Sequence, residues 1–195
     1  MSPPNKTTSY QYRLFFAVEF DAATKTAILN IQQALQQLSE VKGLAVKGEN
    51  FHITLCFIGE VKEKILEKIL DGFQPLTLAP FTISLNDLLY WPKPQVLALT
   101  LKDSEQHLNQ CKKAIERQLV ELNYFQFDKR EYFPHITLFR QVEIPPVANQ
   151  YFYDELSIKS FSLMLSEQTH SGVRYQTLER YPLNHPNIKQ QLLGR

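Results

Sequence analysis

The feature that most constrains this chain is an internal duplication marked by one tetrapeptide. His-Ile-Thr-Leu occurs at residues 52–55 and again at 135–138, 83 positions apart. The segments before it repeat at the same interval, because the β-rich run 13–20 (RLFFAVEF) falls onto 96–103 (VLALTLKD). A repeat of this length predicts two similar folding units in one chain.

Each unit has the pattern of a strand, a helix and a second strand. The segment after each first strand has apolar residues at helical spacing and then leads to a His-Ile-Thr-Leu strand. Further strands are expected at 81–85, 161–165 and 173–181, and a short helix at 61–70. We predict an α+β fold of two pseudo-symmetric lobes, each a mainly antiparallel sheet with helices on the outside. The His-x-Thr strands would face a central cleft; the alternative is one continuous sheet with the units fused edge to edge.

Composition limits the functions that the chain can have. It has 195 residues and a net charge of +1, so no strong overall field favours a long nucleic-acid footprint or an anionic membrane. Two cysteines provide no disulfide framework and suit a reducing compartment, and no stretch approaches membrane-spanning length. We expect a cytoplasmic protein with a disordered leader at 1–11 and a single bilobal domain at 12–195.

Alternation along a strand indicates which side chains share a face. The residues expected in the core of the first repeated strand are Phe51, Ile53, Leu55 and Phe57. The opposite face would carry His52, Thr54 and Cys56, and in the second copy His135 and Thr137. A lone strand histidine is more often structural than catalytic, but the duplication makes that reading less favoured here. We treat His107, His170 and His185 as structural, because no repeat supports them.

Two facing imidazoles suit acid–base catalysis at a phosphodiester, where the nucleophile enters and the leaving oxygen departs on opposite sides of phosphorus. The threonine hydroxyls could donate hydrogen bonds to the phosphate oxygens. Arg140 could add a positive charge, although simple alternation places it on the core face, so the strand must bend or end there. A metal site is disfavoured, because neither an HxxxH nor a CxxC pattern occurs.

These motifs resemble those of the two-histidine phosphoesterase superfamily, in its RNA 2′,3′-cyclic phosphodiesterase (2′-5′ RNA ligase) branch. The resemblance rests on RLFFAVEF (13–20), ENFHITLCFIGEV (49–61), PHITLFR (134–140) and the closing segment 161–183. It implies hydrolysis of a terminal 2′,3′-cyclic phosphate to a 2′-phosphate, without a metal or other cofactor.

The same resemblance implies roles for five residues. His52 would be the proton donor to the departing 3′ oxygen and His135 the proton acceptor that activates water. The phosphate would be held by Thr54, Thr137 and Arg140. Run backwards with an RNA 5′-hydroxyl, this chemistry would make a 2′-5′ linkage.

The expected partners are RNA ends with a 2′,3′-cyclic phosphate, or small cyclic nucleotides, and not a membrane. We expect a monomer that takes part in RNA processing. Two alternatives remain open. One is an enzyme of the same fold that acts on another cyclic nucleotide phosphate, and the other is a non-catalytic RNA-binding module.

Overall fold

The computed structural model describes residues 11–38, 41–128, 130–145, 152, 154–170 and 172–185. In chain order its elements are β1 (Gln11–Glu19), α1 (Ala22–Leu38), β2 (Lys42–Ala45), a short 3₁₀ turn η1 (Gly48–Asn50), β3 (His52–Lys62), α2 (Glu63–Gly72), β4 (Phe81–Trp91), β5 (Val96–Lys102), α3 (His107–Glu121), β6 (His135–Ile144), β7 (Glu155–Ile158), β8 (Ser160–Thr169) and β9 (Gly172–Pro182). The expected leader lies outside the described residues except for Gln11, which begins β1.

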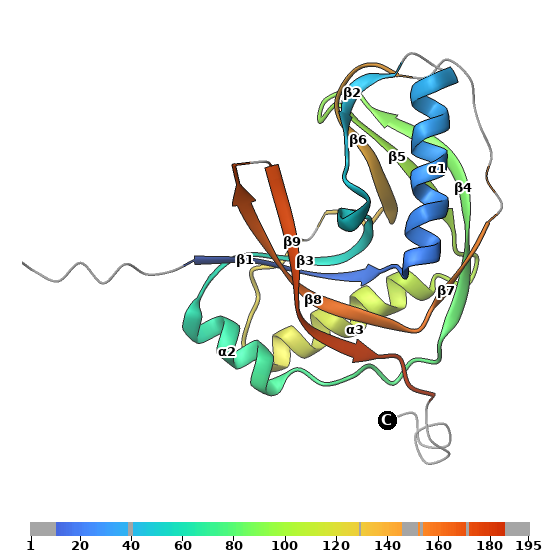
Figure 1. The fold of residues 1–195 in the computed structure, drawn as a ribbon. Coiled ribbons are helices and arrows are strands. Elements are labelled where there is room, and N and C mark those ends of the chain that lie inside the picture. Colours follow the sequence, from blue (N-terminus) through green and yellow to red (C-terminus); the bar gives the residue numbers. More distant parts are fainter. Residues whose placement is uncertain are drawn as a thin grey trace, which may run out of the picture.

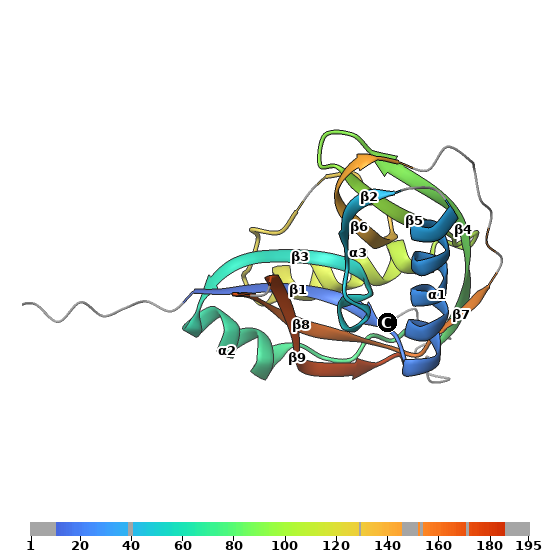
Figure 2. The ribbon, with the colours of Figure 1, turned by 45° about the horizontal axis from the view of Figure 1, so that its top comes forward.

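Two antiparallel sheets form the two lobes. One has the strand order β3-β1-β8-β9 and the other β2-β6-β5-β4-β7. The sheets lie side by side, with α1 along the second sheet and α2 and α3 against the first (Figures 1 and 2). This confirms the predicted α+β fold with two lobes and excludes one continuous sheet.

The duplication is visible in the strand order. The central triplet β3-β1-β8 of one sheet corresponds to β6-β5-β4 of the other. The third strand of each triplet is exchanged, because β4 follows the first unit in sequence but joins the second sheet. The strand pattern predicts that β4 and β8 exist but not this exchange, since strand partners are set by contacts between distant residues.

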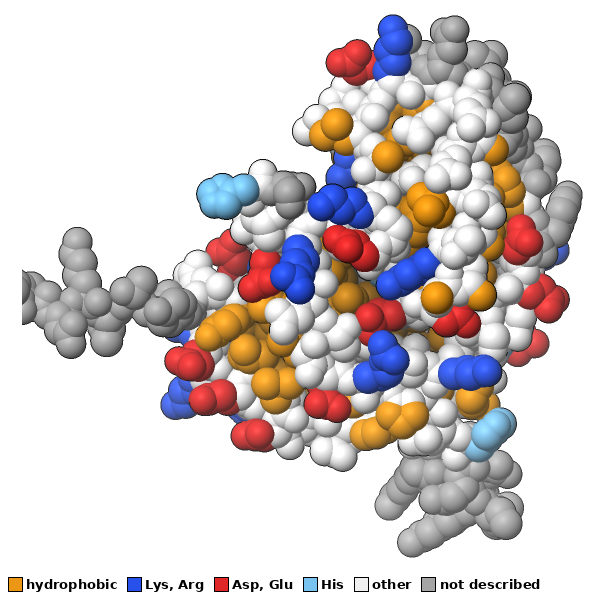
Figure 3. Space-filling view, in the orientation of Figure 1, with side chains coloured by type: hydrophobic (Ala, Val, Ile, Leu, Met, Phe, Trp, Pro, Cys, Tyr) orange, Lys and Arg blue, Asp and Glu red, His pale blue; other side chains and the backbone are white. Residues whose placement is uncertain are grey.

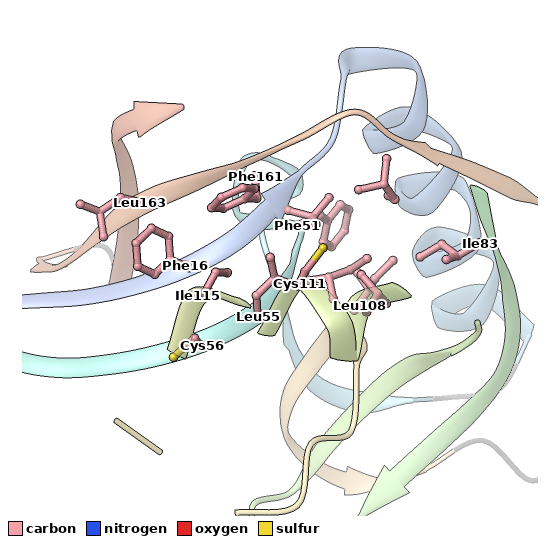
Figure 4. Close-up of a cluster of buried hydrophobic side chains, with 14 of the residues drawn as sticks. Phe16, Phe51, Leu55, Cys56, Ile83, Leu108, Cys111, Ile115, Phe161 and Leu163 are labelled. Atoms are coloured by element: carbon pink, nitrogen blue, oxygen red, sulfur yellow. The ribbon is translucent and has the colours of Figure 1, made fainter. Parts of the chain in front are cut away.

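One hydrophobic core connects the lobes. It takes buried residues from both sheets and from all three helices, including Phe16, Phe161, Ile83 and Ile115 (Figure 4). Helix α3 contributes Leu108, Cys111, Ile115 and Leu119, which recur at three- and four-residue spacing. Because the core is continuous, the strands that carry the repeated motif are held in a fixed relation to each other.

The helix starts explain why the chain turns where it does. The Asp21 carboxylate accepts a hydrogen bond from the Thr24 backbone N–H (2.8 Å) at the start of α1. The Asp103 carboxylate accepts from the N–H groups of His107 (3.0 Å) and Leu108 (2.7 Å) at the start of α3. Such caps satisfy N–H groups that have no partner within the helix. Both helices therefore begin soon after the first strand of their unit.

The surface carries both signs of charge. On the face shown in Figure 3, Lys and Arg side chains are interspersed with Asp and Glu, in keeping with the net charge of +1. Within the described residues, no helix is both long and apolar enough to cross a lipid bilayer. An anionic ligand must therefore be held by local contacts and not by a general field.

Candidate active site

The two repeated histidines have the same backbone setting. His52 begins β3 and His135 begins β6. In each ring Nδ1 lies against the carbonyl oxygen of the residue two positions earlier, Asn50 (2.7 Å) or Phe133 (2.8 Å). A carbonyl only accepts hydrogen bonds, so Nδ1 carries the proton in the neutral ring. Nε2 of each ring is then the nitrogen that can exchange a proton.

Both motif strands have a β-bulge at the leucine of the motif. In β3, Cys56 pairs with Phe16 and Thr54 pairs with Ala17, so Leu55 has no partner. In β6, Phe139 pairs with Leu97 and Thr137 with Ala98, so Leu138 has none. A bulge inserts one residue and shifts the alternation after it by one. The duplication thus includes the backbone irregularity as well as the four residues.

The bulges decide which side chains reach the cleft. In the second copy, the bulge places Arg140 on the same face as Thr137, which the sequence prediction required of that strand. In the first copy the prediction for the end of the strand is wrong. Cys56, expected beside His52, is buried in the core, and Phe57, expected in the core, has 42% of its surface exposed. Simple alternation fails after Leu55 because of the extra residue.

A cavity of about 490 Å³ lies between the two motif strands. It is lined by Thr54 from one copy and by His135, Thr137 and Arg140 from the other. His52 does not belong to this lining, but its Nε2 lies 3.1 Å from the hydroxyl of Thr54, a residue that does. The structure thus brings all five predicted site residues together, while their chemical roles stay a prediction.

His52 is enclosed by aromatic rings. The ring centroids of Phe15 and Tyr175 lie 5.2 and 5.0 Å from that of its imidazole. This burial lowers the pKa of His52 to about 4, and the positive charges of His135 and Arg140 lower it further. The hydrogen bond to Asn50 and the charge of Glu19 act in the opposite direction. The imidazole is therefore neutral in the free protein near pH 7.

His135 has a different surrounding. The indole of Trp91 lies 4.8 Å from its ring in an edge-on arrangement. Burial lowers the pKa of His135, the Phe133 carbonyl partly offsets this, and the charge of Arg140 lowers it as well. Arg140 therefore acts on both imidazoles, which indicates that the three groups converge on one small volume.

The depressed pKa of His52 predicts a loss of stability in mild acid. The unfolded chain binds a proton near pH 6.5 and the folded chain only near pH 4, so the free energy of unfolding should fall between these values. The loss should reach up to about 3 kcal/mol. Urea unfolding at several pH values should show that His52→Asn lacks this part of the pH dependence. The control is His170→Asn, since His170 is exposed; a stability difference between His52→Asn and the wild type that is the same at pH 7 and pH 5 would contradict the prediction.

Several residues that shape the site were not identified from the sequence. Trp91 is the only tryptophan of the chain, and that was the one signal available. Tyr132 donates a hydrogen bond from its hydroxyl to the Thr54 carbonyl (3.1 Å) and so joins the loop before β6 to β3. The Asn50 amide donates to the Val173 carbonyl (2.9 Å) and fixes the β8–β9 hairpin near His52. Such contacts join distant segments, so no local pattern predicts them.

The remaining histidines lie apart from the cavity lining. His107 stacks on Phe81 at the start of α3, between the carboxylates of Asp103 and Glu105, while His170 and His185 are exposed. Across the described ranges, no three His, Cys, Asp or Glu side chains come together as a group that could hold a metal ion.

The sequence matches known phosphoesterases. The family described as LigT like Phosphoesterase matches residues 18–98. The RNA 2′,3′-cyclic phosphodiesterase of Escherichia coli K12 is 31% identical over 179 residues, covering 88% of this chain and 96% of that protein. The enzyme of the same name from Archaeoglobus fulgidus is 31% identical over 176 residues, covering 85% and 97%.

Solved structures share the fold. Escherichia coli LigT complexed with 3′-AMP superposes with a TM-score of 0.76 at 25% identity, covering 90% of this chain and 99% of that one. A protein from Thermus thermophilus gives 0.77 at 25% identity, covering 89% and 98%. With identity above 30% to relatives that are covered almost end to end, the chain belongs to the LigT-like phosphoesterases, in their RNA 2′,3′-cyclic phosphodiesterase branch.

Proposed function

We propose that this protein hydrolyses RNA 2′,3′-cyclic phosphate ends to 2′-phosphomonoesters, using His52 and His135 as an acid–base pair. The observation that carries the proposal is the convergence of both His-x-Thr copies on one cavity. The relatives named RNA 2′,3′-cyclic phosphodiesterase support the choice of substrate. All five site residues come from one chain, which supports a monomeric enzyme, and the two free buried cysteines support a cytoplasmic one.

The proposed reaction begins with proton removal by His135. Its Nδ1–H donates to the Phe133 carbonyl, so Nε2 has the free lone pair that takes a proton from water. The water oxygen attacks phosphorus as the bond from phosphorus to the 3′ oxygen breaks. His52 gives its proton to the departing 3′ oxygen, which leaves a 3′-hydroxyl and a 2′-phosphate. The reverse reaction, with an RNA 5′-hydroxyl in place of water, makes a 2′-5′ linkage.

His52 has to be charged to act as a proton donor. Its pKa of about 4 in the free protein results from burial and from nearby positive charge. A bound phosphodiester anion would favour the imidazolium form, because an opposite charge within a few ångströms raises the pKa of a base. Substrate binding thus prepares the acid, while Thr54, Thr137 and Arg140 hold the phosphate.

The decisive test compares substrates under metal-free conditions. The purified protein should convert an oligonucleotide with a 2′,3′-cyclic phosphate end to the 2′-phosphate form, identified by its resistance to a 3′-phosphatase. The rate should be unchanged by EDTA, because the proposed proton transfers use only imidazoles. A cyclic mononucleotide that reacts much faster than the oligonucleotide would favour the cyclic nucleotide alternative, and binding of RNA ends without turnover would favour the binding module. Activity lost in EDTA and restored by zinc or magnesium would exclude the two-histidine mechanism.

A further inference from the structure

The duplication places two unlike residues at one position beside the two histidines. Glu19 of β1 is the direct cross-strand partner of His52. At the same place in the other lobe, Thr100 of β5 is the partner of His135. Directly opposed residues of antiparallel strands have neighbouring side chains on the same face. One histidine therefore has a carboxylate beside it and the other a neutral hydroxyl.

Glu19 is held by a network of its own. Its carboxylate accepts hydrogen bonds from the hydroxyls of Ser162 and Thr177 (2.8 Å for Thr177) and from the Arg180 guanidinium (3.1 Å). Burial raises the pKa of Glu19, but these three donors outweigh burial and hold the pKa below its ordinary value. Only 17% of the side chain is exposed, whereas Arg180 is 62% exposed. The carboxylate is thus charged, partly buried and fixed in place, while its counterion is largely in solvent.

Thr100 is occupied in a different way. Its hydroxyl donates to the Asp87 carbonyl (3.1 Å) and accepts from the Asp87 backbone N–H (3.0 Å) and the Asn86 amide (3.2 Å). These bonds stabilise the turn of strand β4 and add no charge beside His135. In the part of the chain that the structure describes, no acidic group acts on the pKa of His135. The two lobes therefore differ in charge where their motifs agree.

We propose that Glu19 is a positioning residue that makes His52, and not His135, the proton donor, by stabilising the imidazolium form of His52. This inference rests on the proposed function, because it explains how two equivalent histidines take different roles. The other charged groups that act on His52 are Arg140 and His135, and both oppose its protonation. Phe15 and Tyr175, which enclose the ring, are neutral. Glu19 is thus the one charge found to favour the donor form among the described residues.

The pH dependence of turnover tests this assignment. In a two-histidine mechanism the alkaline limb of the kcat profile reports the acid, because activity is lost when the donor loses its proton. Glu19→Gln keeps the size and hydrogen-bonding capacity of the side chain but removes its charge. The alkaline limb should move down by roughly one pH unit, with about a tenfold loss of kcat above it, while the acid limb stays in place.

Arg180→Gln is the matched variant, because it disturbs the same network with the opposite change in charge. It leaves the Glu19 carboxylate without its counterion, so the alkaline limb should move up and not down. A purely structural role predicts that both variants shift the profile in the same direction or lower kcat at every pH. Glu19→Asp, which keeps the charge, should retain most of the wild-type profile.

NMR titration of the imidazoles in the free protein separates the possible failures. The pKa of His52 should fall in Glu19→Gln and rise in Arg180→Gln, while that of His135 changes much less. Unchanged values in both variants, or an alkaline limb that stays in place while the pKa of His52 moves, would overturn the proposal without affecting the cleavage reaction. Failure of the wild type to cleave 2′,3′-cyclic ends would instead refute the proposed function.

Discussion

Replacing either His52 or His135 by asparagine is expected to lower kcat by about 10²–10⁴, the usual contribution of a positioned acid or base. Asparagine retains an N–H donor near the position of Nδ1, so the bonds to the carbonyls of Asn50 and Phe133 can persist. It has no equivalent of Nε2. The variants should therefore stay folded and bind substrate while losing the proton transfer.

The double variant should lose less than the product of the two single losses, because groups that act in one transition state are not additive. Single-turnover rates with a 2′,3′-cyclic-ended oligonucleotide measure the chemical step, and anisotropy with the 2′-phosphate product measures binding. His170→Asn, which changes an exposed histidine, should behave like the wild type. Full activity in either single variant would show that the histidines do not share a site, and unfolding of both would make the repeated motif structural.

The sequence predicts the duplication and the positions of the motif strands because both depend on local patterns. Two copies of the same four residues in apolar surroundings indicate two equivalent strands, and β3 and β6 begin at those histidines. Alternation also assigns His52, Thr54, His135 and Thr137 correctly to one face. Up to the threonine of each copy, a period of two is enough to predict which side chains face the cleft.

The sequence does not predict the spacing between the repeats beyond the motif. Thr54 and Thr137 are 83 residues apart, but their strand partners Ala17 and Ala98 are only 81 apart. The strands before the motif are therefore equivalent at an interval two residues shorter than the motif predicts. The chain between strand and motif absorbs this difference, so its length is free to vary without a change in the strand pairing.

The bulges and the exchanged strands are missed for a similar reason. A bulge at Leu55 or Leu138 depends on how the motif strand fits the twist of its neighbour, and the leucine itself gives no local signal. The consequence is largest for Phe57 and Arg140, which follow the bulge at the same position in the two copies. One lobe thus presents an aromatic ring to the cleft and the other a guanidinium.

Replacing Arg140 by alanine is therefore expected to have the second largest effect, with kcat/KM reduced by about 10²–10³, as for loss of one donor to a developing anion. Arg140 lines the cavity, and its charge lowers the pKa of both His52 and His135. Its planar fork suits two phosphate oxygens, so Arg140→Lys should restore only part of the activity.

Arg130→Ala is the matched control for Arg140→Ala, because Arg130 lines the same cavity but is 84% exposed and paired with Asp128. Its effect should stay within a few-fold, as is usual for an exposed ion pair. Arg140→Ala should also weaken binding of the 2′-phosphate product and raise the pKa of both imidazoles in an NMR titration, since a nearby positive charge is lost. If Arg140→Ala behaved like Arg130→Ala in rate, binding and titration, the phosphate would have to be held by the threonines alone, and the bulge at Leu138 would have no part in catalysis.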